Sequence, residues 1–286
     1  MVAYLSAAAE GLAWFLVRYT GVVVVLYLLA TVSALAGFAA RMLAAWLALV
    51  VCSLYGVAAS VALRLAGGGR WQLAQYATAR AFKYTMATLT GITFAVEDPH
   101  GVLATTRPAV FIGNHQTALD VLMLGCMFPR YCSDARAALR GAADAIRTHR
   151  QSVYMFPEGT RSNALEPMLL PFKKGAFHLA VQAGVPIVPV AVANYSHLYN
   201  TSKLRFLPGR IPIKVLDPIS TEGLTADDVA DLTTRVRDLM LQEVVALTAQ
   251  ARAESASKAA VAVPAAPPPA KATDKAVASG VDTTSL

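Results

Sequence analysis

Two short segments carry the side chains with which this chain could do chemistry. In Asn-His-Gln-Thr-Ala-Leu-Asp, His115 is followed five residues later by Asp120. An imidazole becomes a useful general base when a carboxylate fixes its tautomer and stabilises the imidazolium. Because five residues span little more than one helical turn, the two side chains can meet where a helix begins. The pair predicts acid–base catalysis; a surface histidine beside a capping Asn114 is the alternative.

The second segment, Phe-Pro-Glu-Gly-Thr-Arg-Ser at 156–162, places an arginine in a turn. Gly159 permits backbone geometry that other residues resist. The planar guanidinium of Arg161 can bind phosphate through two parallel hydrogen bonds, with help from backbone amides of the turn. We expect Glu158 to orient Arg161 or a polar headgroup. A base and an anion-binding turn together suit the acylation of a hydroxyl on a phosphate-bearing acceptor. An exposed arginine on an ordinary turn is the alternative.

Both segments must be positioned by regular elements. Five apolar runs have the length and composition of strands, at 92–96, 108–113, 153–156, 185–193 and 211–216. Five stretches have helical patterns, at 71–89, 117–128, 134–149, 172–183 and 226–248. This alternation predicts an α/β domain with a mixed or parallel sheet flanked by helices. Ligands bind such sheets where strands end and helices begin, which is where both segments lie.

The N-terminal quarter has the composition of membrane segments. The chain is 56% hydrophobic, which exceeds the soluble norm. Residues 19–40 and 42–63 carry no charge, and each is long enough as a helix to cross a bilayer. We expect a membrane-anchoring hairpin within residues 1–70; one span plus an interfacial helix, or a re-entrant hairpin, are the alternatives. Basic residues follow the second run, so the positive-inside tendency places the later residues in the cytosol.

Composition also argues against some classes of function. Residues 64–248 hold 19 basic and 14 acidic side chains, an excess that suits anionic headgroups but is too small to predict nucleic-acid binding. The three cysteines lack metal-ligand spacing, and no further ligands lie near His115 in the sequence. We therefore expect neither a bound metal nor a disulfide framework. Residues 249–286 become rich in Ala and Pro without periodicity, which predicts a disordered tail.

Together these segments resemble the glycerolipid acyltransferases, specifically the fungal-type 1-acyl-glycerol-3-phosphate (lysophosphatidic acid) acyltransferases. Residues 114–120 match the family's NHxxxxD block, and residues 156–162 match its phosphate-binding block. The resemblance covers roughly residues 91–245 and implies an acyltransferase domain at 71–248. It implies that His115 is the catalytic base and Asp120 the residue that orients it. It also implies a binding site for the acceptor phosphate, made by Glu158, Gly159, Thr160 and Arg161.

The resemblance further implies the reaction, the partners and the location. The enzyme would transfer an acyl group from acyl-CoA, a co-substrate, to the sn-2 hydroxyl of lysophosphatidic acid and so form phosphatidic acid. No cofactor is expected, and membrane lipids are the other expected partners. The implied location is the endoplasmic reticulum membrane, with the catalytic domain facing the cytosol. Glycerol 3-phosphate or another lysophospholipid stays open as the acceptor.

One departure from the family pattern lies between the two blocks. The family carries there a lysine-bearing helical stretch and a strand that ends in a Gly-x-x-Phe-Ile-Asp-Arg-like sequence. Here residues 129–133 lead directly into Asp134, so a strand and a helix, roughly 30 residues, are missing near 133/134. Loss of a central strand should be severe, because its neighbours would lose hydrogen bonds and packing. The chain is then either a mis-spliced or mis-predicted version of an active enzyme, or a catalytically impaired membrane lipid-binding isoform.

Overall fold

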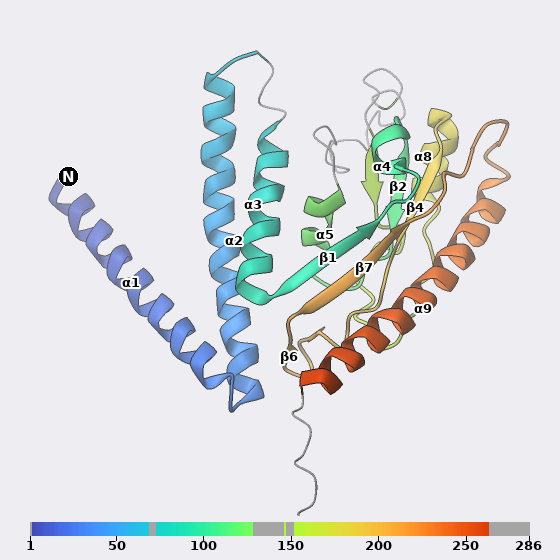
Figure 1. Ribbon diagram of the computed structural model, residues 1–286. Coiled ribbons are helices and arrows are strands. Elements are labelled where there is room, and N and C mark those ends of the chain that lie inside the picture. Colours follow the sequence, from blue (N-terminus) through green and yellow to red (C-terminus); the bar gives the residue numbers. More distant parts are fainter. Residues whose placement is uncertain (1, 69–72, 128–145, 147–151, 263–286) are drawn as a thin grey trace, which may run out of the picture.

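A computed structural model describes residues 2–68, 73–127, 146 and 152–262. At its centre lies a five-stranded mixed sheet in the order β1-β7-β4-β2-β3 (Figure 1). The strands are β1 (Ile92–Glu97), β2 (Val110–Gly113), β3 (Val153–Met155), β4 (Ile187–Val192) and β7 (Gly209–Val215). Only the β4–β7 pair is antiparallel. The predicted α/β class with a mixed sheet is confirmed, and each strand lies on one of the five apolar runs.

Helices cover both faces of this sheet. One face packs against α8 (Gly175–Ala183) and α9 (Val229–Ala262). The other packs against α2 (Ala34–Leu65), α3 (Leu73–Thr90) and α5 (Asp120–Met127). Along β2, Val110 and Ile112 enter the first core and Phe111 enters the second, as the two-residue period of a strand requires. Burial on both faces explains why the strand runs are almost uninterruptedly apolar.

The strand β2 is hydrogen-bonded along both of its edges, to β3 on one side and to β4 on the other. The five described strands therefore form a continuous sheet, with β3 at one end. A short helix α4 (Val102–Thr105) and a small hairpin of β5 (Tyr199–Asn200) and β6 (Arg205–Phe206) complete the elements of this domain. The severe loss of hydrogen bonds expected from a missing central strand is therefore not seen along β2.

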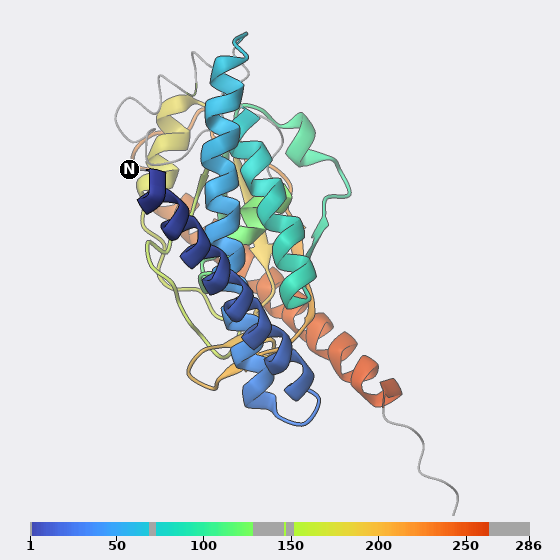
Figure 2. The ribbon, with the colours of Figure 1, turned by 90° about the vertical axis from the view of Figure 1, so that its left-hand side faces the viewer.

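Two long apolar helices precede the sheet. In α1 (Val2–Leu29) the stretch Glu10–Leu29 is long and apolar enough to cross a membrane, and so is the whole of α2. Small buried residues along α2 allow it to approach its neighbours closely, and they are Gly37, Ala40, Ala44, Ala48 and Cys52. α1 lies on the outer side of α2 and diverges from it toward the N-terminus (Figures 1 and 2). Most large side chains of both helices are exposed.

The turn between these helices comes earlier than the sequence predicts. Ser33 caps α2 by accepting the N–H of Ala36. Of the expected spans at 19–40 and 42–63, the first therefore ends at Leu29 and the second begins at Ala34 and ends at Leu65. Arg41 marks the expected boundary, but it lies inside α2 and donates to the carbonyl oxygens of Gly37 and Phe206. Because these carbonyls satisfy its donors, the guanidinium is tolerated within an apolar helix and does not indicate a turn.

The C-terminal helix also departs from expectation. α9 continues to Ala262, past the expected end of the domain at residue 248. Alanine dominates this extension and has the highest helix propensity. Ala251 is buried and Arg252 pairs with Glu166, so the extra turns also pack on the domain. Residues 263–286, the expected helix at 134–149 except Ile146, and the missing segment near 133/134 lie outside the described residues.

Candidate active site

The imidazole of His115 lies against the carboxylate of Asp120. His115 follows β2 in a short loop, and Asp120 begins α5. His115 Nδ1 and Asp120 Oδ2 are 2.7 Å apart. A proton held at Nδ1 by the carboxylate leaves Nε2 with the lone pair that a general base needs. The ring also stacks on Phe156, with 4.2 Å between centroids. The structure thus brings the two predicted catalytic side chains together.

Asp120 is completely buried and is held by four hydrogen bonds. Its Oδ2 also accepts the backbone N–H groups of Gln116 and Thr117, at 2.5 and 3.0 Å. Its Oδ1 accepts the hydroxyl of Tyr195 at 2.6 Å. That hydroxyl lies 2.8 Å from Thr117 Oγ1. A buried carboxylate needs such donors because burial otherwise penalises its charge.

Two amide side chains fix the loop that carries His115 to the end of β4. Asn114 accepts the Val192 N–H through Oδ1 and donates to the Val192 carbonyl through Nδ2. Gln116 Nε2 donates to the carbonyls of Val192 and Ala193. Both amides are buried, so their hydrogen bonds are made away from competing water. The loop around His115 is therefore anchored to the neighbouring strand on either side of the imidazole.

Glu158 joins the two predicted segments. Its Oε1 accepts the backbone N–H of His115 at 2.7 Å, and its Oε2 accepts that of Leu170 at 2.9 Å. The backbone of Ser162 also donates to the His115 carbonyl, at 2.9 Å. Glu158 is only 3% exposed, and within the described residues its carboxylate makes no ion pair with Arg161. The structure therefore places Glu158 as a support of the loops; a direct contact with substrate stays a prediction.

The turn after β3 presents Arg161 to solvent. Gly159 has φ of 68°, a left-handed conformation that favours glycine. A side chain at this position would lie 2.7 Å from Lys173 Nζ, so the end of Lys173 lies over the turn. Thr160 and Arg161 are exposed. In the part of the chain that the structure describes, Arg161 has no hydrogen-bonding or ionic partner, and its guanidinium is free to bind an anion.

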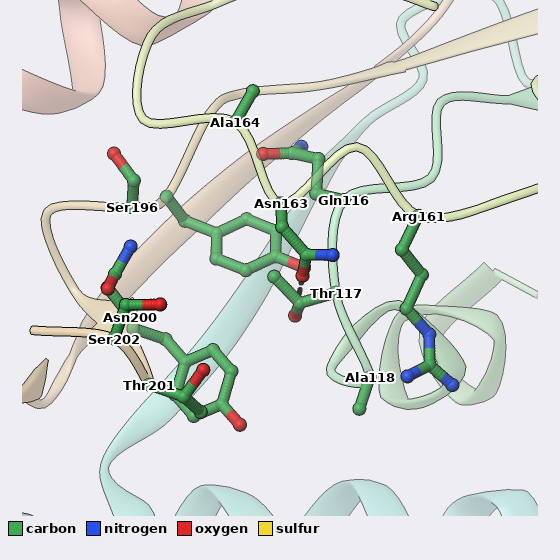
Figure 3. Close-up of a pocket in the computed structure, with 12 residues that line it drawn as sticks. Gln116, Thr117, Ala118, Arg161, Asn163, Ala164, Ser196, Asn200, Thr201 and Ser202 are labelled. Carbon is green, nitrogen blue, oxygen red and sulfur yellow. Dashed lines mark hydrogen bonds between the residues drawn. The ribbon is translucent and has the colours of Figure 1, made fainter. Parts of the chain in front are cut away.

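A polar cavity of about 380 Å³ opens beside this arginine. Figure 3 shows Arg161 on one side of the cavity and the 196–202 loop on the other. Hydroxyl and amide side chains dominate its wall, among them Gln116, Thr117, Asn163, Ser196, Asn200 and Ser202. His115 does not line the cavity, but the three residues that follow it do.

A second cavity, of about 310 Å³, adjoins the first. Arg161, Ala118 and Tyr199 line both cavities. Apolar side chains from α2, α3 and α5 form most of its wall, among them Met42, Trp46, Leu49, Phe82, Met86 and Leu122. An apolar groove beside a candidate membrane helix thus leads to the same guanidinium as the polar cavity. This arrangement fits an amphiphile whose charged end binds at Arg161.

Sequence reasoning missed several members of this site. Tyr195 follows Asp120 by 75 residues, and no local pattern links the two. Gln116 has no sequence signal that distinguishes it from other polar loop residues. Lys173 lies twelve residues after Arg161 in the sequence, and the structure places it over Gly159. No cluster of metal-ligating side chains occurs among the described residues.

Burial of Glu158 predicts a measurable pH dependence of stability. Burial is the largest effect and raises the pKa of this carboxyl above 4.5, although its two N–H donors act in the opposite direction. At pH values between the unfolded pKa and the raised folded pKa, the folded state therefore keeps a proton that the unfolded state has lost. The stability contributed by this group is complete below the unfolded pKa and falls as pH rises through the raised folded pKa.

Glu158→Gln removes this titration. The measured quantity is the melting temperature of the variant minus that of the wild type. We expect this difference to become more positive as pH rises from about 4.5 to 7, because only the wild type loses stability from this group. Thermal unfolding in detergent at several pH values measures this difference. Glu254→Gln, an exposed carboxyl on α9, is the matched control and should show no such trend. A constant difference between the Glu158 variant and the wild type contradicts the assignment.

Several known proteins are similar to this chain in sequence or in fold. A protein-family model described as Acyltransferase matches residues 132–193. An uncharacterized acyltransferase of Schizosaccharomyces pombe is 39% identical, over 69% of this chain and 81% of its own length. The 1-acyl-sn-glycerol-3-phosphate acyltransferase of Saccharomyces cerevisiae is 35% identical, over 68% of this chain and 73% of its own. The crystal structure of the 1-acyl-sn-glycerophosphate (LPA) acyltransferase of Thermotoga maritima superposes with a TM-score of 0.57. It is 21% identical and covers 82% of this chain and 97% of its own, and it shares the fold.

The aligned lengths bear on the missing segment. The alignment with the fission yeast protein extends over 228 positions but covers 69% of the 286 residues, which is about 197 residues. That relative therefore has about 30 positions without a counterpart in this chain. The budding yeast protein shows a similar excess, with 226 aligned positions against 68% of this chain. The excess has about the size of the expected loss of one strand and one helix, roughly 30 residues.

Proposed function

The chain belongs to the family of 1-acyl-sn-glycerol-3-phosphate acyltransferases, and we propose that it transfers an acyl group from acyl-CoA to the sn-2 hydroxyl of lysophosphatidic acid. The product is phosphatidic acid. One observation carries the proposal: the backbone of the Arg161 segment is hydrogen-bonded to the backbone of the His115 loop. A base and an anion-binding side chain are thereby fixed at the same edge of the sheet, where ligands bind in α/β folds.

In the proposed reaction, His115 Nε2 accepts the proton of the sn-2 hydroxyl as the oxygen attacks the thioester carbonyl. A C–O bond forms, the C–S bond breaks, and the leaving thiolate of coenzyme A takes the proton from the imidazolium. Asp120 holds the imidazole and stabilises its positive charge in the transition state. Attack is direct. Ser162 Oγ is buried and without a hydrogen-bond partner among the described residues, so it has no base to activate it as a nucleophile.

Arg161 is proposed to bind the phosphate of the acceptor. Its guanidinium is exposed and unpaired within the described residues, and Lys173 adds a second positive charge over the same turn. A phosphate accepts two parallel hydrogen bonds from a guanidinium, which fixes the acceptor in orientation as well as in position. Gly159 and Thr160 shape the turn, and Glu158 holds it against the His115 loop.

The acyl chain of the acceptor is proposed to lie in the apolar groove. The groove begins on α2, a helix apolar enough to cross a membrane, and ends at Arg161. A lipid with one chain and a phosphate headgroup could therefore approach from the bilayer with its chain leading along α2. This placement leaves the polar cavity on the far side of Arg161 for the hydrophilic part of the donor or acceptor.

Ala45→Phe tests the groove. Ala45 lines it from α2, and a phenyl ring there would displace part of the chain. Losing contact with one or two methylenes at about 0.8 kcal/mol each predicts a rise of roughly 4- to 15-fold in KM for lysophosphatidic acid. Leu54→Phe, at an exposed position of α2 outside the groove, is the control and should leave KM unchanged. An unaltered KM in a folded Ala45→Phe enzyme excludes the groove as the acceptor site.

The proposed function is tested with a panel of acceptors. Purified full-length protein is incubated with radiolabelled oleoyl-CoA and with lysophosphatidic acid, glycerol 3-phosphate or lysophosphatidylcholine. We expect labelled phosphatidic acid from the first acceptor and little product from the other two. Treatment of the product with phospholipase A2 should then release the labelled oleate, because phospholipase A2 hydrolyses the sn-2 ester. A preference for another acceptor, or label retained after this treatment, overturns the corresponding part of the proposal.

The proposed location is the endoplasmic reticulum membrane, with the sheet domain in the cytosol. Support comes from the two apolar helices and from Arg64 at the end of α2, since basic residues favour the cytosolic side. Protease added outside sealed microsomes should digest the sheet domain. Protection of that domain until detergent is added contradicts the proposed orientation.

A further inference from the structure

Among the hydrogen bonds of the described residues, Tyr195 is the side-chain partner of Asp120 that comes from outside the His115 loop. It follows β4, and its hydroxyl donates to Asp120 Oδ1 at 2.6 Å. Tyr195 is only 1% exposed and Asp120 is 0% exposed, so this hydrogen bond is shielded from water. The other carboxylate oxygen, Oδ2, serves His115 and two backbone N–H groups. Among the described residues, Oδ1 has the tyrosine hydroxyl as its partner.

We propose that Tyr195 is a positioning residue that sets the orientation of Asp120 and the share of its charge directed at His115. The inference rests on the proposed acyl transfer. A carboxylate can rotate about its Cβ–Cγ bond, and two donors on opposite oxygens define that rotation. The phenol holds Oδ1, so Oδ2 stays directed at the imidazole. The hydrogen bond from the phenol also attracts negative charge to Oδ1 and so lowers the negative charge on Oδ2, which faces His115.

The phenol is suited to this role because it stays neutral. Burial, the largest effect, together with the nearby Asp120 charge raises the pKa of Tyr195 well above its usual value. Its hydroxyl therefore donates throughout the range in which the enzyme would work. The contact with Thr117 Oγ1 holds the hydroxyl from a second direction. Tyr195 and Thr117 both line the polar cavity, so the tyrosine contacts that cavity as well as the carboxylate.

Four titratable side chains face Asp120 and must be considered in any pH experiment. They are His115 on its own loop, Tyr195 after β4, Tyr154 on β3 and Glu158 after β3. Burial, together with the charge of Asp120, raises the pKa of Tyr154, so that this phenol also stays neutral. Burial raises the pKa of the Glu158 carboxyl above its ordinary value, so Glu158 can contribute to a pH profile of the rate. A direct measurement on the His115 imidazole excludes that contribution.

Tyr195→Phe removes the hydroxyl and keeps the ring that fills the core. Without its donor, Oδ1 is left buried and unpaired, and more negative charge faces His115. We expect kcat to fall roughly 10- to 150-fold, the equivalent of one hydrogen bond to a charged group, with KM for both substrates within about twofold. The pKa of the His115 imidazole should be higher in the variant than in the wild type, because more negative charge faces the ring. Nuclear magnetic resonance of protein labelled at histidine measures that pKa, with His115→Ala used to assign the signal.

A double-mutant cycle shows whether the tyrosine acts through Asp120. In the Asp120→Asn background, Tyr195→Phe should cause less than a twofold further change in kcat, because the carboxylate it serves is gone. Tyr84→Phe, which removes an exposed hydroxyl on α3, is the control and should change neither kcat nor the imidazole pKa. Thermal unfolding confirms that each variant is folded.

The outcomes separate this inference from the proposed function. If the wild type makes no phosphatidic acid, the proposed function fails, while the imidazole pKa still reports on Tyr195. An unchanged His115 pKa in folded Tyr195→Phe overturns the positioning role. A loss of kcat that is equally large in the wild-type and Asp120→Asn backgrounds also overturns it, because Tyr195 would then act through packing alone.

Discussion

Replacing His115 with alanine is expected to lower kcat by roughly 10²–10⁴-fold, the usual contribution of a general base. The hydroxyl would then have to lose its proton to water while it attacks the thioester. Binding should change little, because the imidazole Nε2 interacts with a proton that moves only in the transition state. KM for lysophosphatidic acid is therefore expected to stay within about twofold.

The matched control is His100→Ala. This exposed histidine pairs with Asp217 on the protein surface and lies in no cavity wall described above. Its removal should leave kcat unchanged. Initial rates of free thiol release from acyl-CoA give kcat for both variants under the same conditions. If His115→Ala retains a rate close to that of the wild type, the imidazole is not the base and the proposed mechanism fails.

The second large effect is expected for Arg161→Ala. A hydrogen bond to a charged group contributes about 1.5–3 kcal/mol. Because the guanidinium is exposed, solvent screens part of this, and we expect a rise in KM for lysophosphatidic acid of roughly 10- to 50-fold. Arg161→Lys keeps the charge but loses the planar fork, so its KM should lie between those of the wild type and the alanine variant.

A phosphate-free acceptor makes this test specific. Monoacylglycerol has the same acyl chain and hydroxyl but offers Arg161 no anion. We expect the wild type to prefer lysophosphatidic acid strongly, and Arg161→Ala to lose most of this preference because kcat/KM falls only for the phosphate-bearing acceptor. Equal losses with both acceptors would show that Arg161 supports the loop and does not bind the phosphate.

The parts of the fold that depend on local pattern could be predicted from the sequence. The five strand runs and the meeting of His115 with Asp120 depend on spacing within short segments, and the structure contains both. The contact of Tyr195 with Asp120 could not be predicted, because it depends on β4 lying beside β2 in the sheet. Glu158 shows the same limit. Its residue type suggested a headgroup ligand, but its neighbours in space make it a link between two loops.

Charge misled the prediction of the membrane helices. The expected spans, 19–40 and 42–63, placed their boundary at Arg41 because it is the charged residue between two uncharged runs. Its partners include the carbonyl of Phe206 in β6, a residue that the sequence could not place beside α2. The extent of α9 differed for a similar reason, since the buried Ala251 and the Arg252–Glu166 pair become visible only once the helix packs on the domain.

The segment expected to be missing between the two blocks bears on activity and not on family. The two yeast relatives have about 30 aligned positions without a counterpart in this chain, which is about the size of that segment. The resemblance implies that the arginine of its Gly-x-x-Phe-Ile-Asp-Arg-like sequence is a second arginine that holds the acceptor. The strands β1, β7, β4, β2 and β3 still form a continuous sheet, His115 still pairs with Asp120, and the Arg161 segment is still hydrogen-bonded to the His115 loop. We therefore expect acyl transfer to occur, with Arg161 carrying more of the acceptor binding than it would beside a second arginine.

The central proposal, acyl transfer to lysophosphatidic acid by the wild-type chain, is tested most directly by following a labelled acyl group. Purified wild-type protein in phosphatidylcholine vesicles is given radiolabelled oleoyl-CoA and lysophosphatidic acid, and lipid product and free thiol are followed together. We expect labelled phosphatidic acid to form at a rate that increases linearly with protein concentration, with one thiol released for each molecule of product. The contrary result is a protein that is folded, as shown by cooperative unfolding, but forms no labelled phosphatidic acid. That result would contradict the proposed acyl transfer and would identify the chain as a catalytically impaired lipid-binding isoform.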